Sequence, residues 1–151
     1  AVGHAALDAG INFFDTAEMY PAPPNSKWAG QTEKIMGKWL TGHSRDSIIL
    51  ASKVTGPGSG WFLGPVRSGN SGLDKHNIIR AIEGSLTRMG TDYIDLYQTH
   101  WPDPELPLAE TMEALDRVVE SGQVRYVGCS TQNAHGLIKS LWVSADHAFA
   151  R

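Results

Sequence analysis

The sequence predicts an α/β fold with parallel strands, because segments of strand and helix pattern alternate along the chain. Strand segments are expected at residues 11–15, 47–53, 93–99 and 124–129, and helices at 1–9, 32–40, 74–89, 108–121 and from 133 onward. The run Ile48-Ile49-Leu50-Ala51 is apolar at every position, as is typical of strands covered on both faces. The chain is therefore expected to consist of βαβ units.

The first elements follow from their apolar pattern and their ends. Residues 1–9 have helical character and Gly10 is a plausible C-terminal cap. Residues 11–15 form an apolar run that ends on Asp15, as a buried strand with a polar end would. Residues 32–40 form a helix whose apolar face is expected to carry Ile35, Trp39 and Leu40.

The later elements have clearer boundaries. In the helix 74–89, Asp74 is a good N-cap, Gly90 ends the helix, and the apolar positions 78, 82, 86 and 89 repeat at helical spacing. Gly122 stops the helix 108–121, the strand 124–129 follows, and a further helix begins near Asn133.

Four strands do not decide between an open doubly wound sheet and an eight-stranded barrel. No GxGxxG follows the first strand, which weakens the dinucleotide-binding open sheet. The Gly-rich segment 56–60 lacks the Gly-Lys-Ser/Thr ending of a phosphate loop, so we expect it to be an active-site or surface loop.

Composition excludes several classes of function. The 151 residues are 41% hydrophobic with a formal net charge of −3, and Lys and Arg are dispersed, so no nucleic-acid partner is expected. No apolar stretch approaches the roughly 18 residues that span a bilayer, and no signal peptide opens the chain, so a cytoplasmic protein is expected. The single Cys129 cannot form an internal disulfide. The histidines lack metal-ligand spacing, so no metal site is expected.

The two ends predict a fragment of a longer polypeptide. The chain begins within a helical pattern without Met or an N-cap, and it stops within another helical pattern. Unpaired strand edges of such a fragment would favour self-association.

Polar side chains stand at the end of each expected strand. Asp15, Lys53, His100 and Ser130 follow or end the four strands. Any one of them can be an ordinary polar residue at a strand end. Because the carboxyl ends of parallel strands meet at one edge, and that edge carries the active site in such folds, the group together predicts a site there.

These residue types suit the protonation of an oxygen that gains negative charge. The carboxylate of Asp15 needs a cation, and Lys53 lies one strand away, about 4.8 Å, in a parallel sheet. We expect a buried ion pair. A lysine cation also stabilises the phenolate form of a neighbouring tyrosine, and Tyr20 lies on the loop after Asp15. His100 would add a hydrogen-bonding imidazole.

These residues and their surrounding segments resemble those of a known family. Asp15 and Tyr20 in FFDTAEMY, Lys53 in ILASK, His100 in DLYQTHWPD, and the segments LTRMGTDYIDLYQTH and VRYVGCS are similar to the aldo-keto reductase family, especially its bacterial Tas-like members. The resemblance covers essentially all of the chain. It implies a partial (β/α)8 TIM barrel, formed by a single incomplete domain of residues 1–151 that lacks the first strand and the C-terminal strands.

The resemblance also implies a chemistry and its residues. It implies an NADPH-dependent oxidoreductase that reduces small aldehydes or ketones to alcohols. Tyr20 would be the general acid, Lys53 and Asp15 would adjust the pKa of its phenol, and His100 would orient the carbonyl. Ser130 would contact the nicotinamide carboxamide, but Thr131 stands where the family usually has asparagine. Most contacts to the adenosine phosphates would lie in the missing C-terminal part.

Three further interpretations stay open. Trp101, directly after His100, would either form a wall of the substrate pocket or pack under the turn at Pro102 and Pro104.

The chain would either be catalytic or serve as a binding or regulatory module, because the fold also resembles the β subunits of potassium channels. The intact set of Asp, Tyr, Lys and His favours catalysis. It would alternatively be an inactive truncated piece.

Overall fold

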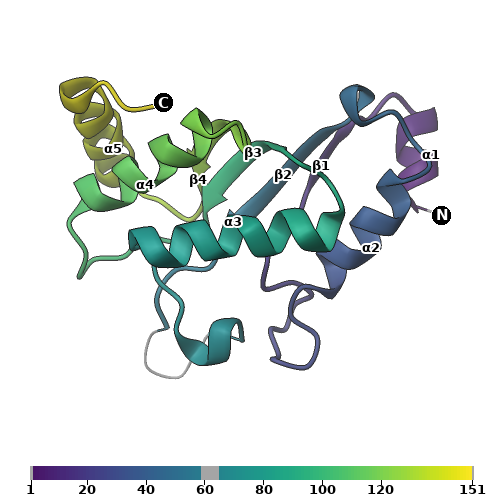
Figure 1. Ribbon diagram of the computed structural model, residues 1–151, viewed down its shortest axis with the longest axis horizontal. Coiled ribbons are helices and arrows are strands. Elements are labelled where there is room, and N and C mark those ends of the chain that lie inside the picture. The colour runs from purple at the N-terminus through teal and green to yellow at the C-terminus, as the bar shows by residue number, and fades with distance from the viewer. Residues whose placement is uncertain (1, 59–64, 151) are drawn as a thin grey trace.

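The computed structural model describes residues 2–58 and 65–150, and within them a single parallel sheet is flanked by helices (Figure 1). The four strands are β1 (Phe13–Asp15), β2 (Ile49–Val54), β3 (Ile94–Thr99) and β4 (Val124–Cys129). They lie in the order β1-β2-β3-β4, and each neighbouring pair is parallel. This sequential order agrees with a segment of a (β/α)8 barrel, since a doubly wound sheet reverses its order at a switch point.

The helices alternate with the strands along the sequence, as predicted. They are α1 (Val2–Asp8), α2 (Gln31–Leu40), α3 (Lys75–Met89), α4 (Leu108–Glu120) and α5 (Ala134–His147), with short 3-10 turns at Arg45–Ser47 and Arg67–Gly69. The strand that was expected at 47–53 starts two residues later, because the 3-10 turn precedes it. No helix among the described residues is both long and apolar enough to cross a membrane.

The predicted N-cap Asp74 is present, and Asn133, where a helix was expected to begin, is also an N-cap. Asp74 accepts a hydrogen bond from the backbone N–H of Asn77 at 3.1 Å, and Asn133 accepts one from Gly136 at 2.8 Å. Gly90 ends α3 in the left-handed region at φ 63°, which favours glycine because that conformation crowds a Cβ atom. Local sequence therefore determines these boundaries.

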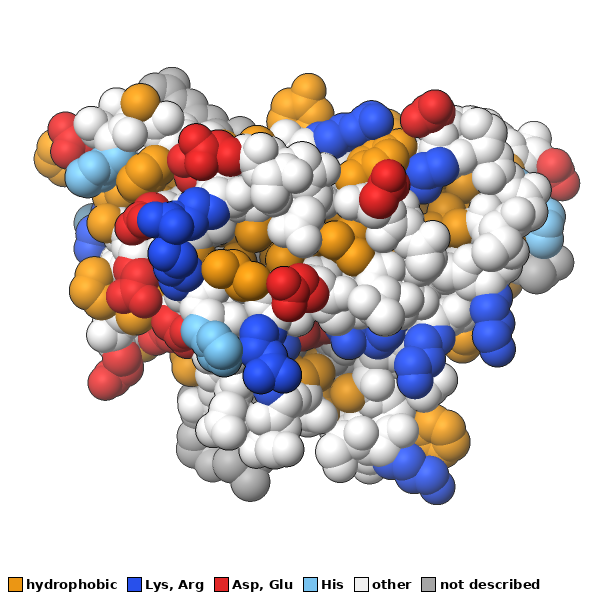
Figure 2. Space-filling model, viewed as in Figure 1, with side chains coloured by type: hydrophobic (Ala, Val, Ile, Leu, Met, Phe, Trp, Pro, Cys, Tyr) orange, Lys and Arg blue, Asp and Glu red, His pale blue; other side chains and the backbone are white. Residues whose placement is uncertain are grey.

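Helices α2, α3 and α4 cover one face of the sheet, with α1 and α5 toward opposite ends of the molecule (Figure 1). Charged side chains of both signs are scattered over this helical layer, as expected for a surface that faces solvent (Figure 2). The core lies between the helices and the sheet, and its largest apolar side chains with at most 2% exposure are Ile48, Leu50, Ile78, Ile82, Met89, Ile94, Tyr97 and Leu115.

The expected apolar face of α2 is only partly correct. Ile35 is 67% exposed, whereas Glu33, Gly37 and Leu40 are buried. A Cβ atom on Gly37 would lie 2.7 Å from the backbone carbonyl oxygens of residues 88 and 89, so glycine allows α2 to approach the end of α3. The buried Glu33 accepts hydrogen bonds from Ser52 and Arg88, and Ile35, about 200° further round the helix, lies on the opposite side.

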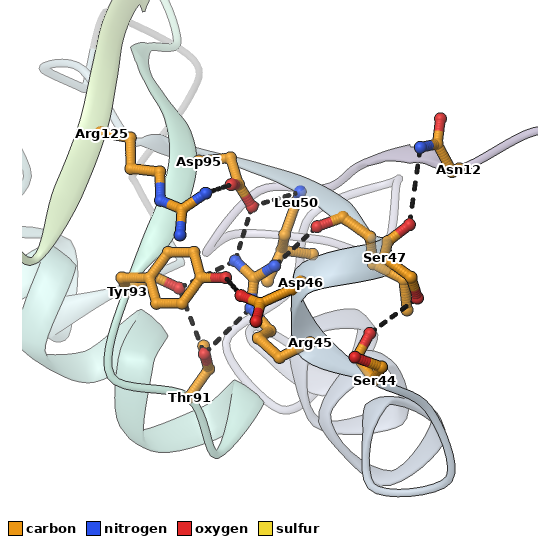
Figure 3. Close-up of polar contacts among 11 residues, drawn as sticks. Asn12, Ser44, Arg45, Asp46, Ser47, Leu50, Thr91, Tyr93, Asp95 and Arg125 are labelled. Carbon is orange, nitrogen blue, oxygen red and sulfur yellow. Dashed lines mark hydrogen bonds and ion pairs between the residues drawn. The ribbon is translucent and has the colours of Figure 1, made fainter.

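A charged cluster joins three strands near their amino ends (Figure 3). The carboxylate of Asp95 accepts hydrogen bonds from the backbone N–H of Leu50 at 2.9 Å, from Arg45 at 2.6 Å and from Arg125 at 3.3 Å. The guanidinium carbons of Arg45 and Arg125 lie 4.0 and 4.1 Å from the ring centroid of Tyr93. Burial, together with the hydrogen bond to Asp46 and the charge of Asp95, raises the pKa of Tyr93 despite the two cations. This end of the sheet is therefore held together by charge and is separate from the carboxyl edge.

The face of the sheet opposite the helices is only partly covered. Side chains alternate along a strand, and the register places Phe13, Ile49 and Tyr126 on one face, where they are 47%, 40% and 67% exposed. The prediction that residues 11–15 form a buried strand is therefore wrong. Strand β1 has only three residues and lies at the edge of the sheet. No described element covers its inner face, which is the face that points away from the helices.

We predict that this exposed face makes the chain associate with itself. Burying an exposed aromatic side chain is favourable, and the outer edges of β1 and β4 carry strand backbone groups that can pair with another copy. Tyr126→Lys is expected to shift the chain toward monomer in sedimentation velocity runs over a range of concentrations. Ile35→Lys, at an equally exposed position on α2, is the matched control. A wild-type chain that stays monomeric at every concentration would contradict this prediction.

Candidate active site

The ion pair expected between the first two strands is present at the carboxyl edge of the sheet. Asp15 is the last residue of β1, and its carboxylate accepts a hydrogen bond from Nζ of Lys53 on β2. Lys53 Nζ also donates to the backbone carbonyl of Thr16 at 2.9 Å. The side chain of Lys53 is 7% exposed, but that of Asp15 is 44% exposed. The pair is therefore half-buried rather than buried as predicted, because the inner face of β1 is uncovered.

A glutamine that sequence reasoning missed completes the hydrogen bonding of Asp15. Gln98 lies beside Lys53 in the register of β2 and β3, and its amide donates to the second carboxylate oxygen of Asp15 at 3.0 Å. The carboxylate thus has one partner on each oxygen, which determines its orientation. The available signal was a polar residue inside the apolar run YIDLYQT, on the same face as Leu96.

Tyr20 lies next to the ion pair and to His100. The ring centroids of Tyr20 and His100 are 5.6 Å apart, with the planes at 75° to one another. Lys53 Nζ is 5.6 Å from the centroid of the Tyr20 ring. The structure therefore brings Asp15, Tyr20, Lys53 and His100 together at the carboxyl edge of three neighbouring strands.

The surroundings of His100 favour its neutral form. Burial lowers the pKa of this imidazole, the cation of Lys53 lowers it further, and the carboxylates of Asp15 and Glu18 oppose the change only partly. Its Nδ1 atom is buried and has no hydrogen-bond partner among the described residues. A neutral imidazole has one nitrogen that donates and one that accepts, so His100 is suited to hydrogen bonding with an uncharged polar group.

Trp101 lies against the loop that follows β2. Its indole N–H donates to the backbone carbonyl of Pro57 at 3.0 Å, and its ring centroid is 4.9 Å from that of His100. A Cβ atom on Gly56 would lie 2.5 Å from the indole nitrogen, so this glycine leaves room for the ring. Residues 59 and 60 of the Gly-rich segment lie outside the described residues. The role of Trp101 as a wall of the substrate pocket stays a prediction.

Ser130 and Thr131 lie one strand further along the same edge. The backbone N–H of Ser130 donates to the carbonyl of Thr99 at 2.8 Å, and the two hydroxyl oxygens of Ser130 and Thr131 are 3.4 Å apart. Within the described part of the chain, no hydrogen bond joins either residue to Tyr20 or His100. Their hydroxyl groups border the site rather than forming part of its central contacts.

Few side chains near this edge could hold a metal ion. Among residues 2–58 and 65–150, no group of three or more His, Cys, Asp or Glu side chains lies close enough together for one. The lone Cys129 is half-buried, and burial raises the pKa of its thiol. The thiol form of this residue is therefore favoured over the reactive thiolate.

Thr131 has a backbone conformation that its side chain disfavours. Its φ of 54° lies in the left-handed region, which is costly for a β-branched residue and which asparagine tolerates better. We predict that Thr131→Asn raises the free energy of unfolding by about 1 kcal/mol, measured by urea denaturation. Thr131→Val, which keeps the branched side chain, should give no gain. Equal stability of Thr131→Asn and wild type would contradict the prediction.

The pKa of His100 gives a second prediction. Lys53→Met removes the cation that disfavours protonation and leaves Asp15 unpaired, so the pKa of His100 should rise, as measured by NMR titration of the ring protons. Lys139→Met on α5 is the control. In the wild type the unfolded chain, with a histidine pKa of about 6.5, binds this proton more readily than the native chain. The contribution of His100 to stability is therefore lost as the pH falls below about 6.5. An unchanged pKa in Lys53→Met would contradict the assignment.

The chain is similar to known proteins over almost all of its length. A model of the aldo/keto reductase family matches residues 1–150. Protein tas of Escherichia coli is 39% identical over 173 aligned residues, which cover 100% of this chain and 49% of the relative. The uncharacterized oxidoreductase YrpG of Bacillus subtilis is 44% identical over 137 residues, which cover 89% of this chain and 40% of the relative.

A solved structure gives the same result for the fold. The thermostable aldo-keto reductase Tm1743, in complex with the inhibitor epalrestat, superposes with a TM-score of 0.76 and 32% identity, over 94% of this chain and 44% of that one. This match confirms the predicted partial (β/α)8 barrel. The chain spans about half the length of the curated relatives it matches. The residues quoted from the sequence, the order of the strands and these similarities agree, and the chain belongs to the aldo/keto reductase family.

Proposed function

We propose that this chain carries the catalytic residues of an NADPH-dependent reductase that converts small aldehydes or ketones to alcohols. The observation that carries the proposal is the contact of Tyr20 with His100 beside the Lys53–Asp15 ion pair. A phenol, an ammonium group and a neutral imidazole at one point suit a reaction in which an oxygen gains negative charge and then a proton.

Each side chain has a distinct role in this proposal. Tyr20 donates its phenol proton to the carbonyl oxygen as hydride reaches the carbon. The ammonium group of Lys53 stabilises the resulting phenolate, and Asp15 holds that ammonium group in place with help from Gln98. His100, favoured in its neutral form, hydrogen-bonds the carbonyl oxygen and orients it.

The cofactor would lie along the same edge. Ser130 and Thr131 present hydroxyl groups that both donate and accept, which fits the amide of a nicotinamide ring. When bound, NADPH supplies the hydride. We propose NADPH as the cofactor and a cytoplasmic location, both as expected from the sequence. A purely regulatory module would not need the contacts among Tyr20, Lys53 and His100, so catalysis is the better account.

A chimera tests the role of Tyr20. This chain would replace the matching segment of the Tm1743 aldo-keto reductase, and NADPH oxidation with benzaldehyde would be followed by absorbance. Tyr20→Phe should lower kcat by about 10²- to 10⁴-fold, the usual contribution of a general acid. NADPH binding, measured by fluorescence, should stay unchanged and shows that the chimera is folded.

The control for this experiment is Tyr126→Phe, which removes a phenol hydroxyl from β4 rather than from the site. A Tyr20→Phe chimera that retains full kcat would contradict the proposal. The 151-residue chain alone is expected to bind NADPH weakly or not at all, because it spans about half of its relatives and its inner face is open. Tight binding by the chain alone would contradict this last expectation.

A further inference from the structure

Glu18 is a buried carboxylate two residues before Tyr20. It is 2% exposed and its neighbours Thr16 and Ala17 are fully buried. One oxygen of Glu18 accepts a hydrogen bond from the backbone N–H of Thr55 at 2.6 Å. A buried carboxylate requires a cation as well as hydrogen bonds, since an uncompensated charge away from water is costly.

Arg67 supplies that cation from the segment between β2 and α3. Its Nη1 atom lies 2.5 Å from one oxygen of Glu18, and its Nη2 atom lies 3.1 Å from the other. The two nitrogens thus bind the carboxylate in a bidentate manner, which specifies orientation as well as charge. The side chain of Arg67 is 16% exposed, so water screens this pair only weakly.

Arg67 is itself held by the first turn of α3. Its Nε atom donates to the side-chain oxygen of Asn77 at 3.0 Å, and the amide nitrogen of Asn77 donates to Asp74 at 2.6 Å. A series of contacts therefore runs from the N-cap of a well-packed helix to the residue two positions before Tyr20. The backbone of Arg67 is in the left-handed region at φ 49°, a costly conformation that these contacts compensate.

Other cations nearby do not take this role. Lys53 pairs with Asp15, and Arg88 pairs with Glu33. Arg80 lines the same hollow of about 350 Å³ as Glu18 and Arg67, but no ion pair joins it to Glu18. Arg67 is thus the side chain that neutralises Glu18.

From these contacts we infer that Arg67 is a positioning residue for the proposed active site: by neutralising the buried carboxylate of Glu18, it keeps the segment that carries Tyr20 in place. The inference rests on the proposed function of Tyr20. If Arg67 is removed, the buried carboxylate of Glu18 has lost its counter-ion, and the segment relaxes toward water. Because Tyr20 is two residues away, its ring then moves relative to His100.

NMR spectroscopy of the chain tests this without any turnover. Tyrosine and histidine rings are labelled, Tyr20→Phe assigns the Tyr20 signals, and the nuclear Overhauser effect between the Tyr20 and His100 rings is measured. Arg67→Met should abolish this effect and shift the Tyr20 signals, Arg67→Lys should restore part of it, and the control Arg80→Met should leave it unchanged. An Arg67→Met spectrum equal to wild type would overturn the inference.

A second variant keeps the test decisive if Arg67→Met fails to fold. Glu18→Gln combined with Arg67→Met removes both charges, and the neutral amide can still accept from the N–H of Thr55. This double variant should fold and recover the Tyr20–His100 effect. A double variant as disrupted as the single one would overturn the inference, because Arg67 would then act through another contact.

The chimera separates this inference from the proposed function. There Arg67→Met should lower kcat by about 10- to 100-fold, the usual cost of a misplaced catalytic group, with NADPH affinity unchanged. If the NMR effects occur but no chimera turns over, the proposed function fails while the positioning of Tyr20 by Arg67 stands.

Discussion

A carboxylate at the end of β1 needs a cation, and in this fold the neighbouring strand supplies it. Lys53 of β2 reaches Asp15 and leaves its ammonium group 5.6 Å from the ring centroid of Tyr20. The rest of the site depends on this contact. The second oxygen of Asp15 is left for Gln98, and the cation beside His100 helps to keep that imidazole neutral. The Asp15–Lys53 ion pair thus fixes the carboxylate of Asp15 and also influences the protonation of the neighbouring His100.

Ion pairs of the same kind occur elsewhere among the described residues. Carboxylates with little exposure pair with a cation from a different element in three further places: Glu18 with Arg67, Glu33 with Arg88 and Asp95 with Arg45. The first joins the segment after β1 to the segment before α3, the second joins α2 to α3, and the third joins β3 to the 3-10 turn before β2 (Figure 3). Such pairs add little net stability over apolar packing, but breaking one is costly, so they specify which elements meet.

Local pattern was enough to predict most of the fold from the sequence. The caps at Asp74 and Gly90 and the strand 124–129 depend on short-range signals, and the structure has them as expected. The exposed face of β1 and the outward position of Ile35 could not be predicted, because both depend on what packs against them. The Asp15–Lys53 pair was predicted from strand neighbours. Gln98, Glu18 and Arg67 were missed, because their partners are distant in sequence and their spacing gives no motif.

A double-mutant cycle at Asp15 and Lys53 tests the central claim most directly. The free energy of unfolding would be measured by urea denaturation for wild type, Asp15→Asn, Lys53→Met and the double variant. We predict that the effects are not additive, with a favourable coupling energy of about 1 kcal/mol, because each single change leaves the other charge unpaired. Additivity within about 0.3 kcal/mol would contradict the claim that this ion pair organises the site.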